Sequence, residues 1–144
     1  MTKPVIDEIL QVGIVVKDID QSISIWENLY GISPWEIMHV NQETSRDIKV
    51  YGQPVDGYDA ILAMSKVGQM HIELIQPISD NSDYYFFLRD HGEGIHHLAI
   101  KHNQGFLNLI KERDIKELGS AVLGSTFCAY YDTRKDLGFI TETF

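Results

Sequence analysis

Four side chains with metal-binding chemistry occupy matched places in two halves of this chain. Gln11 and Glu73 lie in apolar, strand-like segments of the first half, and His97 and Glu142 lie in corresponding segments of the second. Amide, carboxylate and imidazole donors without a thiolate suit a borderline or hard divalent cation. Two carboxylates would neutralise the charge of the cation, and four protein ligands would leave room for water or substrate oxygens. We therefore expect one divalent metal ion at these four residues.

Each of the four residues also has an ordinary structural explanation when it is considered alone. A single strand glutamate usually faces solvent, a buried histidine is usually a hydrogen-bonded core residue, and Gln11 is an unremarkable polar strand residue. However, a glutamate within an apolar strand is costly to bury unless it is paired or metal-bound. The matched placement of all four residues is what favours a metal site.

The elements that must position these residues are strands, in which successive side chains alternate between two faces. In the first segment Gln11 and Gly13 share one face, and in the segment 95–101 His97 and Ala99 share one face. The small residues leave space beside Gln11 and His97, whereas bulky apolar residues fill the opposite faces. Strict alternation places His96 on the apolar side, where we expect a structural histidine.

The order of expected elements repeats along the chain. Each half reads as a strand, an amphipathic helix and three further strands, with the extra residues of the first half in a polar loop at 41–58. A short helix, with Ser82 as a plausible N-cap, connects the halves. The sequence therefore predicts two similar modules within one α+β domain.

Composition limits the classes of function. The chain has 144 residues, and 12 Lys and Arg against 21 Asp and Glu give a net charge of −9, which argues against a nucleic-acid partner. Hydrophobic residues make up 44% of the chain, as in globular domains. No apolar run is long enough for a membrane span, and Cys128 is the only cysteine. We expect a cytoplasmic protein without membrane association that folds by packing alone.

Four segments carry a resemblance to a known family: QVGIVVKDID, IELIQP, GEGIHHLAI and DTRKDLGFITETF. Together they resemble the vicinal oxygen chelate superfamily, which includes glyoxalase I, methylmalonyl-CoA epimerase, extradiol dioxygenases and bleomycin-resistance proteins. The resemblance implies two paired βαβββ modules whose curved mixed sheet surrounds a metal-containing cleft. On this frame module one spans about 9–77, the linker helix about 80–92 and module two about 95–144 of a single domain.

The resemblance also implies the ligand set. Gln11, Glu73, His97 and Glu142 match the four ligand positions, and this set is most similar to that of zinc-type glyoxalase I. Epimerases usually have His where Gln11 stands, and the two-His, one-Glu pattern of the iron dioxygenases is not met. Val15 stands where glyoxalase I has an arginine for glutathione. The expected metal is zinc, nickel, cobalt or manganese.

The function that the resemblance implies is an isomerase, epimerase or lyase that enolises a small carbonyl or acyl-thioester substrate. Glu142 is the expected general base, Glu43 and Glu73 are candidates for a second acid/base, and His71 either transfers protons in the cleft or lies in solvent at a hairpin. A metal-free protein of the bleomycin-resistance kind, which binds a small molecule in the same cleft, is the alternative. The resemblance also implies a homodimer.

Overall fold

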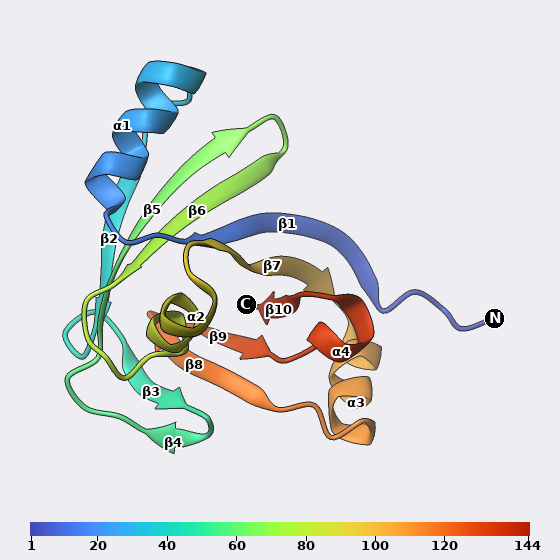
Figure 1. Ribbon diagram of the computed structural model, residues 1–144. Coiled ribbons are helices and arrows are strands. Elements are labelled where there is room, and N and C mark those ends of the chain that lie inside the picture. Colours follow the sequence, from blue (N-terminus) through green and yellow to red (C-terminus); the bar gives the residue numbers. More distant parts are fainter.

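The computed structural model describes all 144 residues, which form one sheet and four helices (Figure 1). The first half contains β1 (Ile6–Val15), α1 (Ile19–Tyr30), β2 (Glu36–Asn41), β3 (Arg46–Val50), β4 (Gln53–Pro54), β5 (Asp59–Val67) and β6 (Met70–Pro77). Helix α2 (Asp83–His91) connects it to β7 (Gly94–His102), α3 (Gln104–Glu112), β8 (Glu117–Leu123), β9 (Thr126–Tyr131), α4 (Arg134–Leu137) and β10 (Ile140–Thr143).

The ten strands form one curled mixed sheet in the order β2-β5-β6-β1-β7-β10-β9-β8-β3-β4. The first and last strands of each half pair in parallel, as β1 with β6 and β7 with β10, and the antiparallel pair β1–β7 joins the halves. This arrangement confirms the expected α+β fold with paired modules. The strand pairs β1–β6, β1–β7 and β7–β10 place the candidate ligands of both halves on neighbouring strands.

The polar segment 41–58 contains more structure than the sequence indicates. The hairpin β3–β4 leaves the first half and adds to the far edge of the second half, where β3 pairs antiparallel with β8. Figure 1 shows this hairpin beside β8, remote in the picture from β5 and β6. A strand from the first half therefore helps to enclose the concave side of the second half.

Local capping explains where the helices begin. The Asp18 carboxylate accepts a hydrogen bond from the Gln21 amide at the start of α1, and Gly31 ends that helix in the left-handed conformation with φ 69°. The Ser82 hydroxyl accepts from the Tyr85 amide, which confirms the expected N-cap of α2. Ser82 thereby places Asp83 in the first turn of a helix that packs against β1, β6 and β7.

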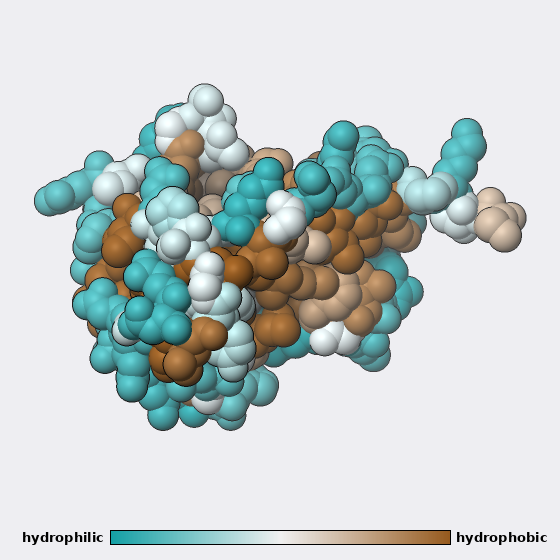
Figure 2. All heavy atoms as spheres, turned by 90° about the horizontal axis from the view of Figure 1, so that it is seen from above, coloured by the Kyte–Doolittle hydropathy of each residue, from teal (hydrophilic) through white to brown (hydrophobic).

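The main core lies on the concave side and includes Val15, Ile75, Tyr84, Tyr130 and Ile140. On the opposite face, α1 covers a smaller cluster that includes Ile19 and Leu74. Figure 2 shows a band of apolar side chains across the outer face seen from above, with hydrophilic groups around it. None of the helices is long and apolar enough to cross a membrane.

Candidate metal centre

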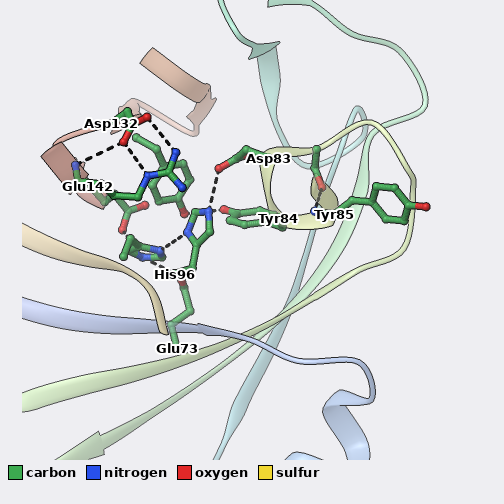
Figure 3. A network of polar contacts seen from close by, with 11 residues as sticks. Glu73, Asp83, Tyr84, Tyr85, His96, Asp132 and Glu142 are labelled. Carbon is green, nitrogen blue, oxygen red and sulfur yellow. Dashed lines mark hydrogen bonds and ion pairs between the residues drawn. The ribbon is translucent and has the colours of Figure 1, made fainter. Parts of the chain in front are cut away.

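Three of the four predicted ligands converge on one point. The ligand atoms of Glu73, His97 and Glu142 all lie within 4.8 Å of one another. His97 Nε2 is 3.5 Å from Glu73 Oε1 and 3.3 Å from Glu142 Oε1, and Figure 3 shows both glutamates directed toward the histidine pair. All three residues are buried. A cluster of this composition can hold a metal ion.

Strand register brings these residues together. Gly13 on β1 lies opposite Glu73 on β6 and opposite His97 on β7, so the two ligands flank a residue without a side chain. A Cβ atom at position 13 would lie 2.0 Å from His97 Cε1. The space that the sequence predicts beside Gly13 is therefore occupied by the His97 ring. Glu142 reaches the same point from β10, where it lies opposite Ala99.

The unpaired atoms of the cluster test whether a metal fits. Glu73 Oε1, His97 Nε2 and Glu142 Oε1 are fully buried and have no hydrogen-bond partner. Buried polar atoms without partners are rare because each costs about 1–3 kcal/mol. Ligand bonds of about 2.1 Å place neighbouring donor atoms roughly 3.0–3.5 Å apart around one ion. The residues present therefore fit a divalent cation in both chemistry and spacing.

The electrostatics of the cluster lead to the same conclusion. Burial, followed by the charge of Glu142, raises the pKa of Glu73 to about 8. Burial raises the pKa of Glu142 to about 7, and it lowers the pKa of His97. These directions of the pKa shifts indicate that no group of the protein balances the negative charge of the two buried carboxylates. A cation bound among them would supply the missing positive charge.

The fourth predicted ligand is close to the cluster. Gln11 is buried on the same face of the sheet, and a hydrogen bond between its side chain and Glu73 lowers the pKa of that carboxyl against the larger effect of burial. The Gln11 side chain also lines the cleft above the cluster. It is thus placed where an amide oxygen could complete a ligand set.

The other predicted site residues lie away from the cluster. Glu43 is exposed in the turn between β2 and β3, where its backbone N–H donates to Asn41 Oδ1, and it does not line the cleft. His71 is exposed at the start of β6 and lines an outer groove together with Lys66 and Gln69. The structure brings neither residue to the three ligand atoms.

His96 differs from the expectation of strict alternation. The pairing of β1 with β7 shifts register between Gly13 and Ile14, which makes His96 the extra residue of a β-bulge. His96 Nδ1 lies 3.0 Å from His97 Nδ1, and His96 Nε2 lies 3.1 Å from Asp83 Oδ2. The expectation that His96 faces away from His97 is therefore wrong, because the bulge turns both rings toward the same interior.

Glu73 and Glu142 line a cleft of about 410 Å³, and the fully buried His97 lies behind them. Both halves line the cleft, with Met38, Val40, Ile48, Tyr58, Leu62 and Met64 from the first half and Ala121, Leu123, Cys128, Tyr130 and Phe144 from the second. Lys49 is its only cationic residue, and no arginine lines it. The outer groove with His71 shares Gln11, Met38, Met64 and Phe144 with this cleft and extends it outward.

Tyrosine hydroxyls border the inner end of the cleft. Tyr84 and Tyr130 are joined by a hydrogen bond of 2.5 Å between their hydroxyls, and Tyr58 lies beside Tyr84. Burial raises the pKa of all three phenols, so they remain neutral hydrogen-bonding groups. A hydrogen bond from Tyr130 lowers the pKa of Glu142 against the larger effect of burial.

Comparison with known proteins agrees with this fold. Residues 10–122 match the Glyoxalase/Bleomycin resistance protein/Dioxygenase superfamily, so the chain belongs to this superfamily, the vicinal oxygen chelate proteins. It is similar to the uncharacterized protein YqjC of Bacillus subtilis (strain 168), with 30% identity over 89 residues, 62% of this chain and 53% of that protein. The match thus spans about half the length of that relative.

Solved structures share the whole fold. The methylmalonyl-CoA epimerase from Mycobacterium tuberculosis superposes with a TM-score of 0.69 at 17% identity, over 99% of this chain and 90% of that one. A variant of the Streptomyces coelicolor methylmalonyl-CoA epimerase, in complex with 2-nitronate-propionyl-CoA, gives 0.65 at 21% identity, over 96% of this chain and 93% of that one. At these identities the likeness establishes the fold.

Proposed function

We propose that this protein is a divalent-metal-dependent isomerase, epimerase or lyase that moves a proton on the carbon beside a carbonyl group. The convergence of three buried, unpaired ligand atoms beside a cleft that Glu73 and Glu142 line carries the proposal. Membership of the superfamily supports it. So does the likeness to the epimerase fold.

We assign proton transfer to the two glutamates. A divalent cation bound at the cluster would act as a Lewis acid on a substrate oxygen and make the neighbouring C–H more acidic. Glu142 and Glu73 flank His97, so that one carboxylate can remove a proton and the other can return it. The Tyr130 hydroxyl offsets part of the rise that burial causes in the pKa of Glu142. We assign Glu142 the role of general base because it lies at the end of this tyrosine pair.

The cleft favours an apolar substrate group near the reacting carbon. Twelve of its lining residues are hydrophobic, and an ionised group without a partner would be costly to desolvate there. The outer groove provides room for the remainder of a longer molecule. One solved epimerase of this fold is in complex with methylmalonyl-CoA and NH4+. We therefore propose a small carbonyl compound or acyl thioester with an apolar substituent.

Deuterium incorporation tests this function. Protein loaded with zinc, nickel, cobalt or manganese is incubated in heavy water with a panel of 2-oxo acids and acyl thioesters, and proton exchange is followed by NMR. Exchange that depends on protein and metal, and stops when the metal is chelated, is the expected result. Tight metal binding without exchange on any probe would reject the catalytic role.

The alternative is a small-molecule binding protein that uses the same cleft without metal. The apolar walls of the cleft are the observation that favours it. Such a protein has no need for two buried carboxylates beside a histidine, which are costly in a binding pocket. Probe binding that is unchanged by removal of divalent metals would support this alternative against the isomerase.

A further inference from the structure

A line of buried polar contacts continues behind His97. His97 Nδ1 lies 3.0 Å from His96 Nδ1, and His96 Nε2 lies 3.1 Å from Asp83 Oδ2 at the start of α2 (Figure 3). The three side chains are at most 5% exposed. The contacts therefore connect the metal cluster to helix α2 through buried side chains.

The chemistry of these groups dictates where each proton lies. An ionised carboxylate only accepts hydrogen bonds, so the proton between Asp83 and His96 belongs to His96 Nε2. A neutral imidazole carries one N–H, so His96 Nδ1 must accept. The proton between the two rings then belongs to His97 Nδ1. His97 Nε2 is left with a lone pair directed at the cluster.

Once they are ionised, Glu73 and Glu142 oppose this arrangement when no cation is bound. Either carboxylate would favour the reversed tautomer, in which His97 Nε2–H donates to it across 3.3–3.5 Å. That tautomer blocks the ligand atom. A group on the far side of His97 is needed to hold the ring in the ligating form.

We propose that Asp83 is a positioning residue that, through His96, fixes His97 as the Nδ1–H tautomer and keeps Nε2 ready for the cation. This inference rests on the metal site of the proposed function. A metal-ligating histidine commonly donates its second ring N–H to a carboxylate or carbonyl, which fixes its tautomer and orientation. In this chain a second histidine transmits the effect of the carboxylate.

The packing around Asp83 and His97 supports a fixed geometry. A Cβ atom at Gly119 would lie 2.9 Å from Asp83 Oδ1, and one at Gly13 would lie 2.0 Å from His97 Cε1. Asp83 and His97, the two ends of this line of contacts, thus each occupy space that is available because the neighbouring residue is a glycine. The first turn of α2 also stabilises the negative charge of Asp83. The aromatic rings of Tyr84, Phe87 and Tyr130 surround His96 and exclude other partners.

The tautomers can be observed directly in metal-free protein. Long-range ¹H–¹⁵N NMR of ¹⁵N-labelled protein should show His97 as Nδ1–H and His96 as Nε2–H. In Asp83→Ala we expect His97 to become a mixture of tautomers and zinc affinity to fall about 10–100-fold. Asp90→Ala is the matched control, because Asp90 is an exposed carboxylate on the same helix. It should leave both measurements as in the parent.

A second variant keeps the test decisive if Asp83→Ala does not fold. Asp83→Asn preserves the shape but offers both a donor and an acceptor, so it should also give mixed His97 tautomers. A parent protein with His97 as Nε2–H would overturn the inference, as would Asp83 variants with parental tautomers and zinc affinity. The expected tautomers in a protein that binds no cation would instead reject the metal site of the proposed function.

Discussion

The imidazole ring of His97 occupies the space that a side chain at position 13 would need. A Cβ on Gly13 would lie 2.0 Å from His97 Cε1 and 2.5 Å from both ring nitrogens. Contacts this short cannot be relieved without displacing the ring or the strands. Gly13 is thus part of the structure that presents His97 to Glu73 and Glu142.

Substitution Gly13→Ala should displace His97. We expect the free energy of unfolding to fall by about 1–3 kcal/mol, as for overpacked cores, and zinc affinity to fall at least about tenfold because a ligand is misplaced. Denaturant unfolding and calorimetric titration measure the two effects. Val12→Ala is the control, since Val12 lies on the opposite face of β1 and should change stability but not zinc affinity. Parental zinc affinity in Gly13→Ala would contradict this account.

The two glutamates can be separated by parallel substitutions. Glu142→Gln keeps a ligand oxygen but removes the base, so it should retain much of the metal affinity and reduce deuterium exchange about 10²–10⁴-fold. Glu73→Gln is the matched variant, because it makes the same chemical change at a similar distance from His97 Nε2. Glu73 Oε1 lies 3.5 Å from that atom and Glu142 Oε1 lies 3.3 Å from it. Glu73→Gln should reduce deuterium exchange less than Glu142→Gln does, when the exchange begins with removal of the proton by Glu142. A larger loss of deuterium exchange in Glu73→Gln than in Glu142→Gln would show that Glu73, and not Glu142, is the general base.

Metal-free protein should lose stability as the pH rises. The folded pKa values of Glu73 and Glu142, about 8 and about 7, exceed the ordinary value of 4.5, so each carboxyl binds its proton more tightly when folded. Their stabilising contribution is complete below about pH 4.5 and is lost as the pH rises through about 7–8. Urea unfolding with a chelator between pH 6.5 and pH 8 measures this slope, because below pH 6.5 the lowered pKa values of buried His96 and His97 contribute an opposite slope.

Saturating zinc should remove or reverse this slope, because a cation stabilises the ionised carboxylates. The double variant Glu73→Gln, Glu142→Gln should show neither the slope nor its response to zinc. A stability of the metal-free parent that rises between pH 6.5 and pH 8 would contradict the burial of two uncompensated carboxylates.

The apolar cleft predicts a preference between two matched probes. Phenylpyruvate and oxaloacetate share the 2-oxo acid group but carry a phenyl ring or a second carboxylate. Zinc-loaded protein should bind phenylpyruvate at least about tenfold more tightly, because the second carboxylate would be desolvated without a partner. Calorimetry measures both affinities. Equal affinities would indicate an anion site in the cleft.

We expect the protein to form a homodimer. The sheet has edge strands at β2 and β4, and half-buried apolar residues lie in register on the outer face at Val12, Ile72 and Leu98. Association would cover such surface. Light scattering at micromolar concentration should give about twice 16.5 kDa. A mass of one chain would contradict the expectation, and a charged substitution at Val12 should weaken the dimer.

Much of the site follows from local sequence pattern. Alternation in single strands places Gln11, Glu73, His97 and Glu142 on the faces with small neighbours, because side-chain direction in a strand depends only on neighbouring residues. The repeated order of elements likewise predicts paired modules, since each helix and strand is encoded by its own periodicity. Capping by Ser82 is local for the same reason.

Tertiary structure decided the features that depend on register and on distant pairing. The bulge at His96 arises where β1 and β7 pair, and it turns a histidine that was expected on the apolar face of the strand into the link between His97 and Asp83. The crossing of β3 to β8 leaves Glu43 in an exposed turn and encloses the cleft. Pairing between strands far apart in sequence sets both features, so no local pattern could reveal them. The sequence by itself therefore determined which residues could hold a cation, and only the fold determined what supports them.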